Sequence, residues 1–185
     1  MQWLRGPGRI KPGIKALIYG AGGGLGTFAV QLAKYYGAEV PAFCGKMNIH
    51  VLRSLGAGYA ISYLDGGING IIGHYDFVLA VNGSKPLKAC LRLLATGGIC
   101  VMVGGSLEQV VKALVFGGFM SLGSRKIHSF NAKPDAVDLA FVIRLAEEGR
   151  LRSVLDRRYP LAWTIEAVRY QNKGHAMGKI IIEVV

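Results

Sequence analysis

A cluster of glycines between a short apolar run and a helical pattern constrains this chain more than any other feature. The cluster covers residues 20–26 and has the sequence GAGGGLG. The apolar run at 15–20 precedes it, and large apolar residues recur at helical spacing over 27–36. Glycine is the residue that sharp strand-to-helix turns require. The sequence therefore predicts a strand, a tight turn and a helix in succession.

Three small residues of this loop, Ala21, Gly23 and Gly26, have the spacing A-x-G-x-x-G. The first permits the tight turn, the second lets the backbone approach a pyrophosphate, and the third lets helix and strand pack closely. The helix N-terminus then offers free N–H groups and a positive dipole to the phosphates. Because the spacing lies between a predicted strand and a predicted helix, it indicates a dinucleotide site.

Two other nucleotide-binding motifs, that of short-chain reductases and the P-loop, do not account for these glycines. Gly20, Gly24 and Gly26 also satisfy the G-x-x-x-G-x-G spacing of short-chain reductases, but no tyrosine of the chain has a lysine four residues later. A P-loop fails because neither Gly-Lys pair, at 45–46 or 178–179, is followed by Ser or Thr.

The alternation of apolar runs and helical patterns predicts an α/β fold. A doubly wound parallel (Rossmann) sheet of about six strands forms a domain over 1–150, and a short αβ tail covers 151–185. Pro41 within the second strand favours an edge or a bulge. In the tail, an apolar run at 151–155 and a break at Pro160 precede the helix and last strand. The predicted strands are 15–20, 38–44, 59–62, 75–81, 99–103, about 122–130 and 179–185; the predicted helices are 27–36, 48–55, 87–94, 108–115, 134–148 and 164–171.

Composition and charge bound the partners and the compartment. The chain has 185 residues and a formal net charge of +11, but the basic residues are spread out and lack aromatic interleaving, which argues against nucleic acid. The uncharged stretches at 93–107 and 113–124 are too short for a transmembrane helix. No hydrophobic signal core occupies 1–15, and the three cysteines form no C-x-x-C, so we expect a cytoplasmic protein without a metal site. The four histidines are scattered, and we nominate none as a catalyst.

The end of the second predicted strand distinguishes the two nicotinamide dinucleotides. An acidic residue there would bond the ribose hydroxyls and repel a 2′-phosphate. Residues 42–48 contain no acid and one lysine, Lys46. This favours NADP over NAD.

From the glycine loop onward the chain resembles the medium-chain dehydrogenase/reductase superfamily, in its quinone-oxidoreductase-like, zinc-independent branch. The stretches that carry the resemblance are 10–13, 20–26, 29–34, 53–57, 75–76 and 174–180. The resemblance covers the cofactor-binding domain and the tail that returns to the family's N-terminal catalytic domain. It implies a reductase that transfers hydride from NADPH to a quinone or an α,β-unsaturated carbonyl, and a homodimer formed through the sixth strand.

The resemblance also assigns candidate cofactor residues. Gly23, Gly24, Leu25 and Gly26 match the pyrophosphate loop, and Gly45, Lys46 and Asn48 fall where the family holds the 2′-phosphate. Tyr63 matches a tyrosine that closes that pocket, while Asn82, Val103 and Gly104 would flank the nicotinamide. Met47 stands where the family usually has arginine, so the phosphate contact would either move to Lys46 or be weaker. The substrate pocket and any zinc ligands would precede Met1.

Three hypotheses follow for the chain. The leading one is the cofactor half of an NADPH-dependent oxidoreductase, in which hydride transfer to a small-molecule substrate belongs to the cofactor. The second is a non-catalytic nucleotide-binding or scaffold protein. The third is a truncated fragment, whose strand at 179–185 would lack a partner and form an exposed apolar edge able to pair with another copy.

Overall fold

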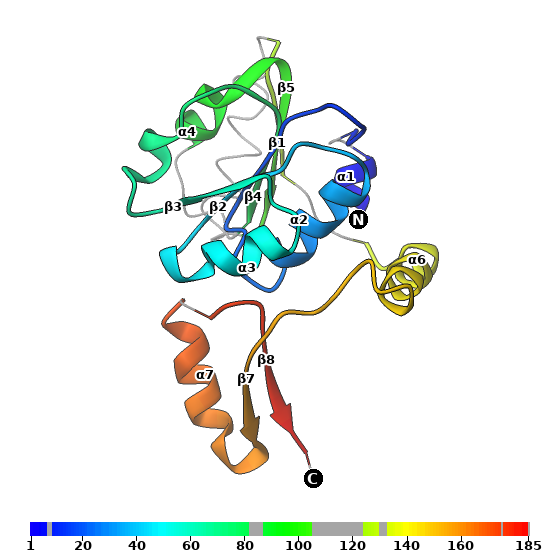
Figure 1. The fold of residues 1–185 in the computed structure, drawn as a ribbon, viewed down its shortest axis with the longest axis vertical. Coiled ribbons are helices and arrows are strands. Elements are labelled where there is room, and N and C mark those ends of the chain that lie inside the picture. The colour runs from blue at the N-terminus through cyan, green and yellow to red at the C-terminus, as the bar shows by residue number, and fades with distance from the viewer. Residues whose placement is uncertain (7–8, 82–86, 105–123, 130–132, 175, 185) are drawn as a thin grey trace.

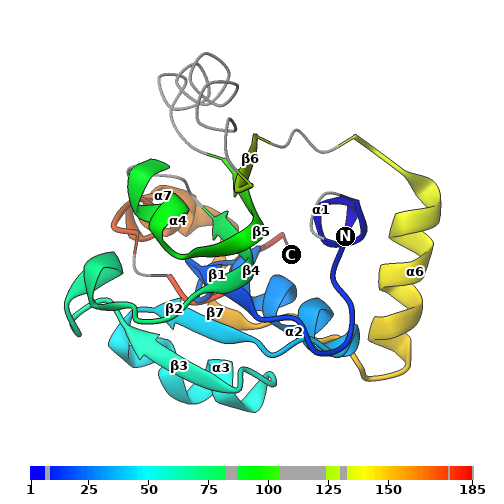
Figure 2. The same ribbon diagram turned by 90° about the horizontal axis from the view of Figure 1, so that it is seen from above.

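A computed structural model describes the chain as a large parallel sheet with a smaller two-stranded sheet below it (Figures 1 and 2). The described residues are 1–6, 9–81, 87–104, 124–129, 133–174 and 176–184. The predicted helix at 108–115 lies outside them.

The large sheet has, in the described residues, six parallel strands in the order β3-β2-β1-β4-β5-β6. The chain therefore runs outward from β1 in one direction, then crosses back to β4 and runs outward in the other. Such a reversal places a topological switch point at the carboxyl ends of β1 and β4. The predicted doubly wound α/β fold is confirmed. The strands are β1 Ala16–Tyr19, β2 Pro41–Cys44, β3 Tyr59–Ser62, β4 Tyr75–Val81, β5 Leu94–Val103 and β6 Lys126–Ser129.

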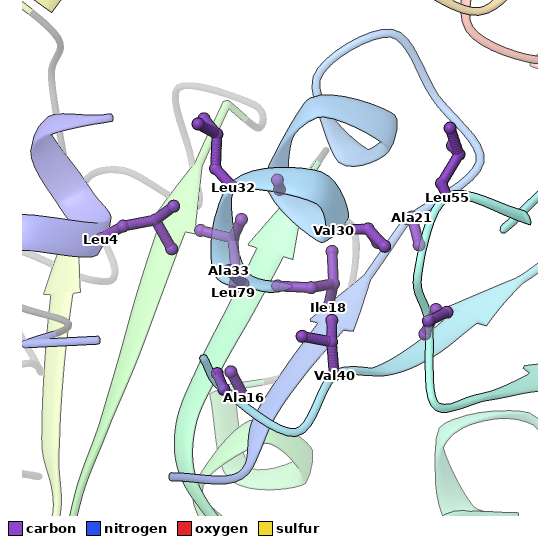
Figure 3. Packing of buried hydrophobic residues seen from close by; sticks show 14 of the residues in the cluster. Leu4, Ala16, Ile18, Ala21, Val30, Leu32, Ala33, Val40, Leu55 and Leu79 are labelled. Atoms are coloured by element: carbon purple, nitrogen blue, oxygen red, sulfur yellow. The ribbon is translucent and has the colours of Figure 1, made fainter. Parts of the chain in front are cut away.

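Helices cover both faces of this sheet. Alternate residues of a strand point to opposite faces, so Ile18 of β1 packs in one core and Leu17 in the other. The first core includes residues of α1, α2, α3 and α6 (Figure 3), and the second includes Cys90 of α4. The helices are α1 Gln2–Arg5, α2 Gly26–Tyr35, α3 Ile49–Ser54, α4 Leu87–Arg92 and α6 Ala136–Glu147, with 3-10 turns η1 Lys46–Asn48, η2 Gly67–Gly70 and η3 Leu161–Trp163.

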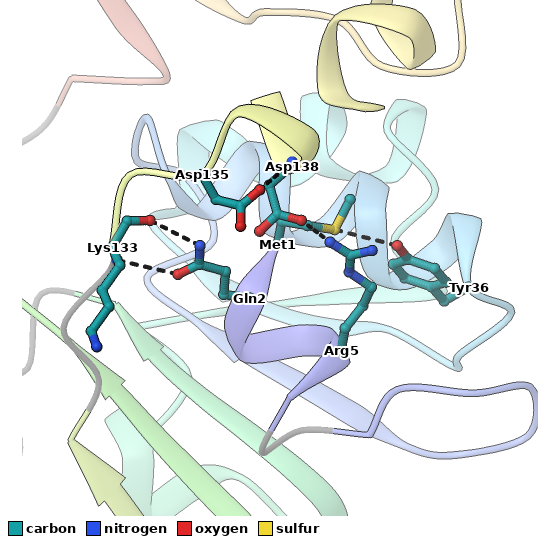
Figure 4. Close-up of polar contacts among 7 residues, drawn as sticks. All are labelled: Met1, Gln2, Arg5, Tyr36, Lys133, Asp135 and Asp138. Atoms are coloured by element: carbon teal, nitrogen blue, oxygen red, sulfur yellow. Dashed lines mark hydrogen bonds and ion pairs between the residues drawn. The ribbon is translucent and has the colours of Figure 1, made fainter. Parts of the chain in front are cut away.

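The short helix α1 was not predicted, and polar contacts attach it to the rest of the domain (Figure 4). The Gln2 amide donates to the Lys133 carbonyl at 2.8 Å and accepts from the Lys133 N–H at 3.2 Å. Arg5 forms an ion pair with Asp138 of α6. The N-terminal turn therefore docks against the start of α6.

The expectation that Pro41 marks an edge or a bulge is wrong. β2 lies between β1 and β3, and its pairing with β3 runs from Pro41 to Cys44 without a register shift. Pro41 is the first residue of the strand, a position where proline is tolerated within a sheet.

The tail forms a small αβ unit in which the last strand has a partner. β7 Leu155–Pro160 pairs in parallel with β8 Lys179–Glu183, and α7 Thr164–Asn172 connects them. The last strand therefore has one partner, β7, while among the described residues its other edge pairs with no strand, so only the expectation that it lacks any partner is wrong. Pro160 is the last residue of β7 and lies opposite Glu183, so the strand ends at the proline where the sequence indicated a break, but it covers 155–160 and not 151–155. The Tyr170 hydroxyl donates to Asp156 at 3.0 Å and fixes α7 to β7.

Candidate functional site

The glycine loop lies at the carboxyl end of β1, beside the switch point. Gly20 has a φ of +80°, a conformation that favours glycine, and a Cβ there would lie 2.8 Å from the Val81 carbonyl oxygen. The N–H groups of Gly20 and Ala21 both donate to the Phe43 carbonyl at 3.1 Å. The loop is thus held against the ends of both neighbouring strands, β2 and β4.

Gly23 and Gly26 have different surroundings. A Cβ on Gly26 would overlap the Gly20 carbonyl oxygen and the Ala21 backbone, so the close packing predicted for this glycine is present. A Cβ on Gly23 would meet only the Gly20 carbonyl oxygen, at an ordinary 3.7 Å. Glycine is therefore required by the fold at 26, whereas at 23 the fold leaves room for a side chain.

The start of α2 presents unused backbone donors. Within the described part of the chain, neither the Leu25 nor the Gly26 N–H donates to a backbone carbonyl. No side chain caps the helix, and its first turn contains no acid. Free N–H groups at the positive end of a helix dipole are a favourable environment for an anion.

The residues after β2 meet the glycine loop from one side. Gly45 is extended and begins η1, where the Asn48 N–H donates to its carbonyl at 2.9 Å. The side-chain amide of Asn48 occupies the space that a Cβ on Gly22 would need. Lys46 is exposed, and the Met47 side chain is 89% exposed. This strand end therefore combines one exposed cation with an amide donor.

Tyr63 belongs to an aromatic cluster at the carboxyl ends of the first three strands. Its N–H donates to the Cys44 carbonyl at 2.9 Å. Its ring contacts Phe43 edge-on at 4.8 Å between centroids and Tyr19 at 5.6 Å. Burial, followed by the proximity of Tyr19 and Cys44, raises the pKa of the Tyr63 phenol. Its hydroxyl therefore stays protonated and can donate a hydrogen bond.

The other predicted residues lie further along the sheet. Val103 is half-buried at the end of β5, and Gly104 follows it, exposed and with a φ of +73°. β4 separates β5 from β1, so these two residues lie across the switch point from the glycine loop. Asn82 lies outside the described residues.

The tail contributes two residues to the loop that sequence reasoning did not assign. The Gly178 N–H donates to the Gly22 carbonyl at 2.8 Å, and Gly178 forms a parallel bridge with Gly23. A Cβ on Gly24 would lie 2.9 Å from the Gly178 carbonyl oxygen and from two methylene carbons of Lys179. Both residues belong to the stretch at 174–180 that carries the family resemblance, but its sequence carries no signal that it folds back onto residues 22–24.

The described residues contain neither a metal-ligand cluster nor a membrane-spanning helix. Within the described ranges, no group of three or more His, Cys, Asp or Glu side chains is arranged to hold a metal ion. Cys44, Cys90 and Cys100 are all buried and free, as expected for small apolar residues on strands and helices. None of the described helices has the length and apolar character needed to cross a bilayer.

The fold and loop together define a doubly wound α/β domain of the Rossmann type. The profile of the family described as zinc-binding dehydrogenase matches residues 55–182. The chain is 30% identical to the chloroplast envelope quinone oxidoreductase homolog of Arabidopsis thaliana, over 99% of this chain and 58% of that protein. It is 31% identical to the mitochondrial NAD(P)H oxidoreductase RTN4IP1 of Mus musculus, over 94% of this chain and 48% of that protein.

A solved structure shows the same arrangement. The quinone oxidoreductase from Coxiella burnetii superposes with a TM-score of 0.87 at 25% identity, over 100% of this chain and 56% of that one. The chain thus spans about half the length of the relatives that it matches. It belongs to the zinc-binding dehydrogenase family, within the quinone-oxidoreductase-like medium-chain dehydrogenases/reductases, and corresponds to their Rossmann half. The predicted resemblance to the quinone-oxidoreductase-like members of this superfamily is confirmed.

Proposed function

We propose that this chain is the NADPH-binding part of an oxidoreductase. The observation that carries the proposal is the combination of free N–H groups at Leu25 and Gly26 with an acid-free β2 end that exposes Lys46. The free N–H groups of Leu25 and Gly26 can donate hydrogen bonds to a pyrophosphate. The missing acid removes the repulsion that would oppose a 2′-phosphate, and Lys46 adds attraction.

The chain's own residues would divide the binding of the cofactor among them. The backbone of Gly23, Gly24, Leu25 and Gly26 would bind the pyrophosphate, and Gly45, Lys46 and Asn48 the 2′-phosphate. Tyr63 would close the adenosine side with its protonated hydroxyl. Asn82, Val103 and Gly104 would orient the nicotinamide, which supplies the hydride when bound. We assign no catalytic residue, metal or zinc to this chain.

We infer a quinone or an α,β-unsaturated carbonyl as the hydride acceptor. The support comes from relatives named as quinone oxidoreductases in a plant and in Coxiella burnetii. Residues 1–150 would form the cofactor domain and 151–185 a tail that belongs with a catalytic domain. We keep a cytoplasmic location as part of the proposal, supported by three unpaired cysteines, although relatives include proteins named as chloroplast and mitochondrial. Pairing of β6, an edge strand of the sheet, would form a homodimer.

Calorimetric titration of the chain with NADPH and with NADH tests the cofactor. We expect NADPH to bind more tightly, and Lys46→Ala to weaken NADPH by roughly tenfold, the value of one charge-assisted phosphate contact. The same substitution should leave NADH unchanged, because NADH lacks the phosphate. Arg53→Ala, which removes an exposed cation from α3, is the matched control. Equal weakening of both dinucleotides, or binding of neither, would contradict the proposal.

Turnover with quinones and enones separates the enzyme from the non-catalytic alternative. Consumption of NADPH with either acceptor supports the oxidoreductase. Tight binding without turnover supports a nucleotide-binding or scaffold role for the chain by itself.

A further inference from the structure

A second concave surface lies among the helices on one face of the large sheet, away from the glycine loop. A cavity of about 430 Å³ opens between the C-terminal halves of α2 and α3 and the segment that follows α6. Its polar lining consists of Gln31, Lys34, Tyr35, Ser54, Arg150 and Arg152. Lys34 is eight residues beyond Gly26, so along the helix it lies about 12 Å from the start of α2. The cavity is therefore separate from the proposed cofactor site.

A buried glutamine fixes one arginine at the edge of this cavity. The Gln31 side chain is only 7% exposed. Its Nε2 donates to the Arg152 carbonyl at 3.0 Å, and its Oε1 accepts from the Arg152 N–H at 2.9 Å. Both backbone polar groups of Arg152 are thereby satisfied by one amide. The arginine backbone is held in one position against α2.

The Arg152 guanidinium is fixed as well. One of its terminal nitrogens donates to the Ser54 Oγ at 2.9 Å and points to the Ser54 carbonyl at 3.5 Å. A guanidinium has five N–H donors in a rigid fork, so several donors remain for a ligand. A donor that is positioned before binding loses less conformational entropy when the ligand arrives.

Charge around the cavity is positive and poorly balanced. In the described part of the chain, neither Lys34 nor Arg152 forms an ion pair. The third cation, Arg150, has its Nε 3.3 Å from Glu148, and its guanidinium lies 5.8 Å from the centre of the Tyr35 ring. Cations gathered in a concave surface raise the local concentration of anions.

We propose that this cavity binds a small phosphate-bearing molecule at a site distinct from the cofactor site. Arg152 is the fixed donor, and Lys34 and Arg150 neutralise the ligand's charge. A guanidinium fork suits a tetrahedral oxyanion, to which it can donate two hydrogen bonds at once. The cavity volume lies within the range usual for small-ligand sites.

Titration with inorganic pyrophosphate at constant ionic strength tests this site. We expect Arg152→Gln and Lys34→Gln each to weaken binding by about tenfold or more, because each removes a charge-assisted contact. Arg53→Gln, an exposed cation outside the cavity, should leave the affinity unchanged. Gly23→Ala separates the cofactor site, because pyrophosphate held at the glycine loop would respond to this variant and not to Arg152→Gln.

Thermal unfolding of every variant shows that it is folded. If Arg152→Gln fails to fold, Lys34→Gln decides, since the Lys34 ammonium bonds no other described residue. Pyrophosphate affinities equal to wild type in both cavity variants would overturn the proposal. The proposal would also be overturned if wild type bound a single-stranded oligonucleotide but no pyrophosphate, and the cavity variants lost the oligonucleotide binding. The cations would then bind a polymer.

Discussion

At the scale of single residues, we expect Gly26 to be needed for folding and Gly23 for cofactor binding. A Cβ at 26 would overlap the backbone of residues 20 and 21, whereas a Cβ at 23 meets nothing closer than 3.7 Å. We expect Gly26→Ala to lower the free energy of unfolding by about 1–3 kcal/mol, as overpacking does. Gly23→Ala should leave stability within about 0.5 kcal/mol of wild type, but should weaken NADPH binding, because we place the pyrophosphate against the backbone of this residue.

Urea unfolding and NADPH titration of both variants measure these effects. Equal stability of the two variants would show that the packing at Gly26 is more tolerant than its geometry indicates. Full NADPH affinity in Gly23→Ala would place the pyrophosphate away from this residue.

The buried thiol of Cys44 makes stability depend on alkaline pH. Burial raises the pKa of this thiol from 9.0 to about 11 in the folded protein. The folded state therefore holds the proton more strongly than the unfolded chain. This contribution to stability is fully present below pH 9 and is lost as the pH rises towards 11.

Across that window we expect the free energy of unfolding of wild type to fall by up to about 2–3 kcal/mol more than that of Cys44→Ala, which has no thiol to titrate. Urea unfolding of both proteins at neutral and alkaline pH gives the difference. Parallel loss of stability in the two proteins would rule out Cys44 as its source.

Several residues of the candidate site could be predicted from sequence because local chemistry determines them. The loop at 20–26 combines a turn requirement with a spacing, and the absence of an acid over 42–48 is visible directly. Gly178 and Lys179 could not be assigned in this way. Their contact with residues 22–24 joins segments more than 150 positions apart and depends on the path of the tail.

At the scale of elements, α6 depends on the cap at its first turn. The Asp135 carboxylate accepts from the Asp138 N–H at 2.8 Å, which satisfies one of the free donors of the helix. We expect Asp135→Ala to lower the free energy of unfolding by about 1 kcal/mol. Asp135→Asn keeps an acceptor oxygen and should remain within a few tenths of a kcal/mol of wild type. Urea unfolding checks both, and an unchanged Asp135→Ala would mean that α6 is held by its packing alone.

The elements that sequence predicted well are those with a continuous apolar pattern. β4 at 75–81 is buried along nearly its whole length, and its predicted bounds match the structure. β7 was misjudged because LDRRYP has two adjacent arginines and no regular apolar alternation, and none of its residues is buried. Helix α1, with four residues, is too short to show a period. β7 is stabilised by pairing with β8, and α1 is stabilised by docking against α6. Neither contact can be predicted from the sequence of the element itself.

At the scale of the whole molecule, two sheets meet at one glycine of the tail. Gly178 has a φ of +76°, and a Cβ there would overlap the Val154 carbonyl as well. The same residue bonds the Gly22 carbonyl, while the following N–H, of Lys179, donates to Val154 at 2.8 Å. The glycine loop, the chain entering β7 and the start of β8 thus converge at one point. The tail helps to shape the loop that we propose as the cofactor site.

Gly178→Ala should therefore disturb the tail and the glycine loop together. Gly174→Ala is its matched control, because Gly174 has a similar φ of +71° but a Cβ there would meet nothing within 4 Å. Both variants bear the strain of a left-handed alanine, about 1 kcal/mol, so any larger effect of Gly178→Ala comes from its contacts. We expect faster amide exchange over 179–183 and at the glycine loop, and weaker NADPH binding, only in Gly178→Ala. Equal exchange in the two variants would mean that the tail and the loop are independent, and the cofactor site would then belong to the large sheet alone.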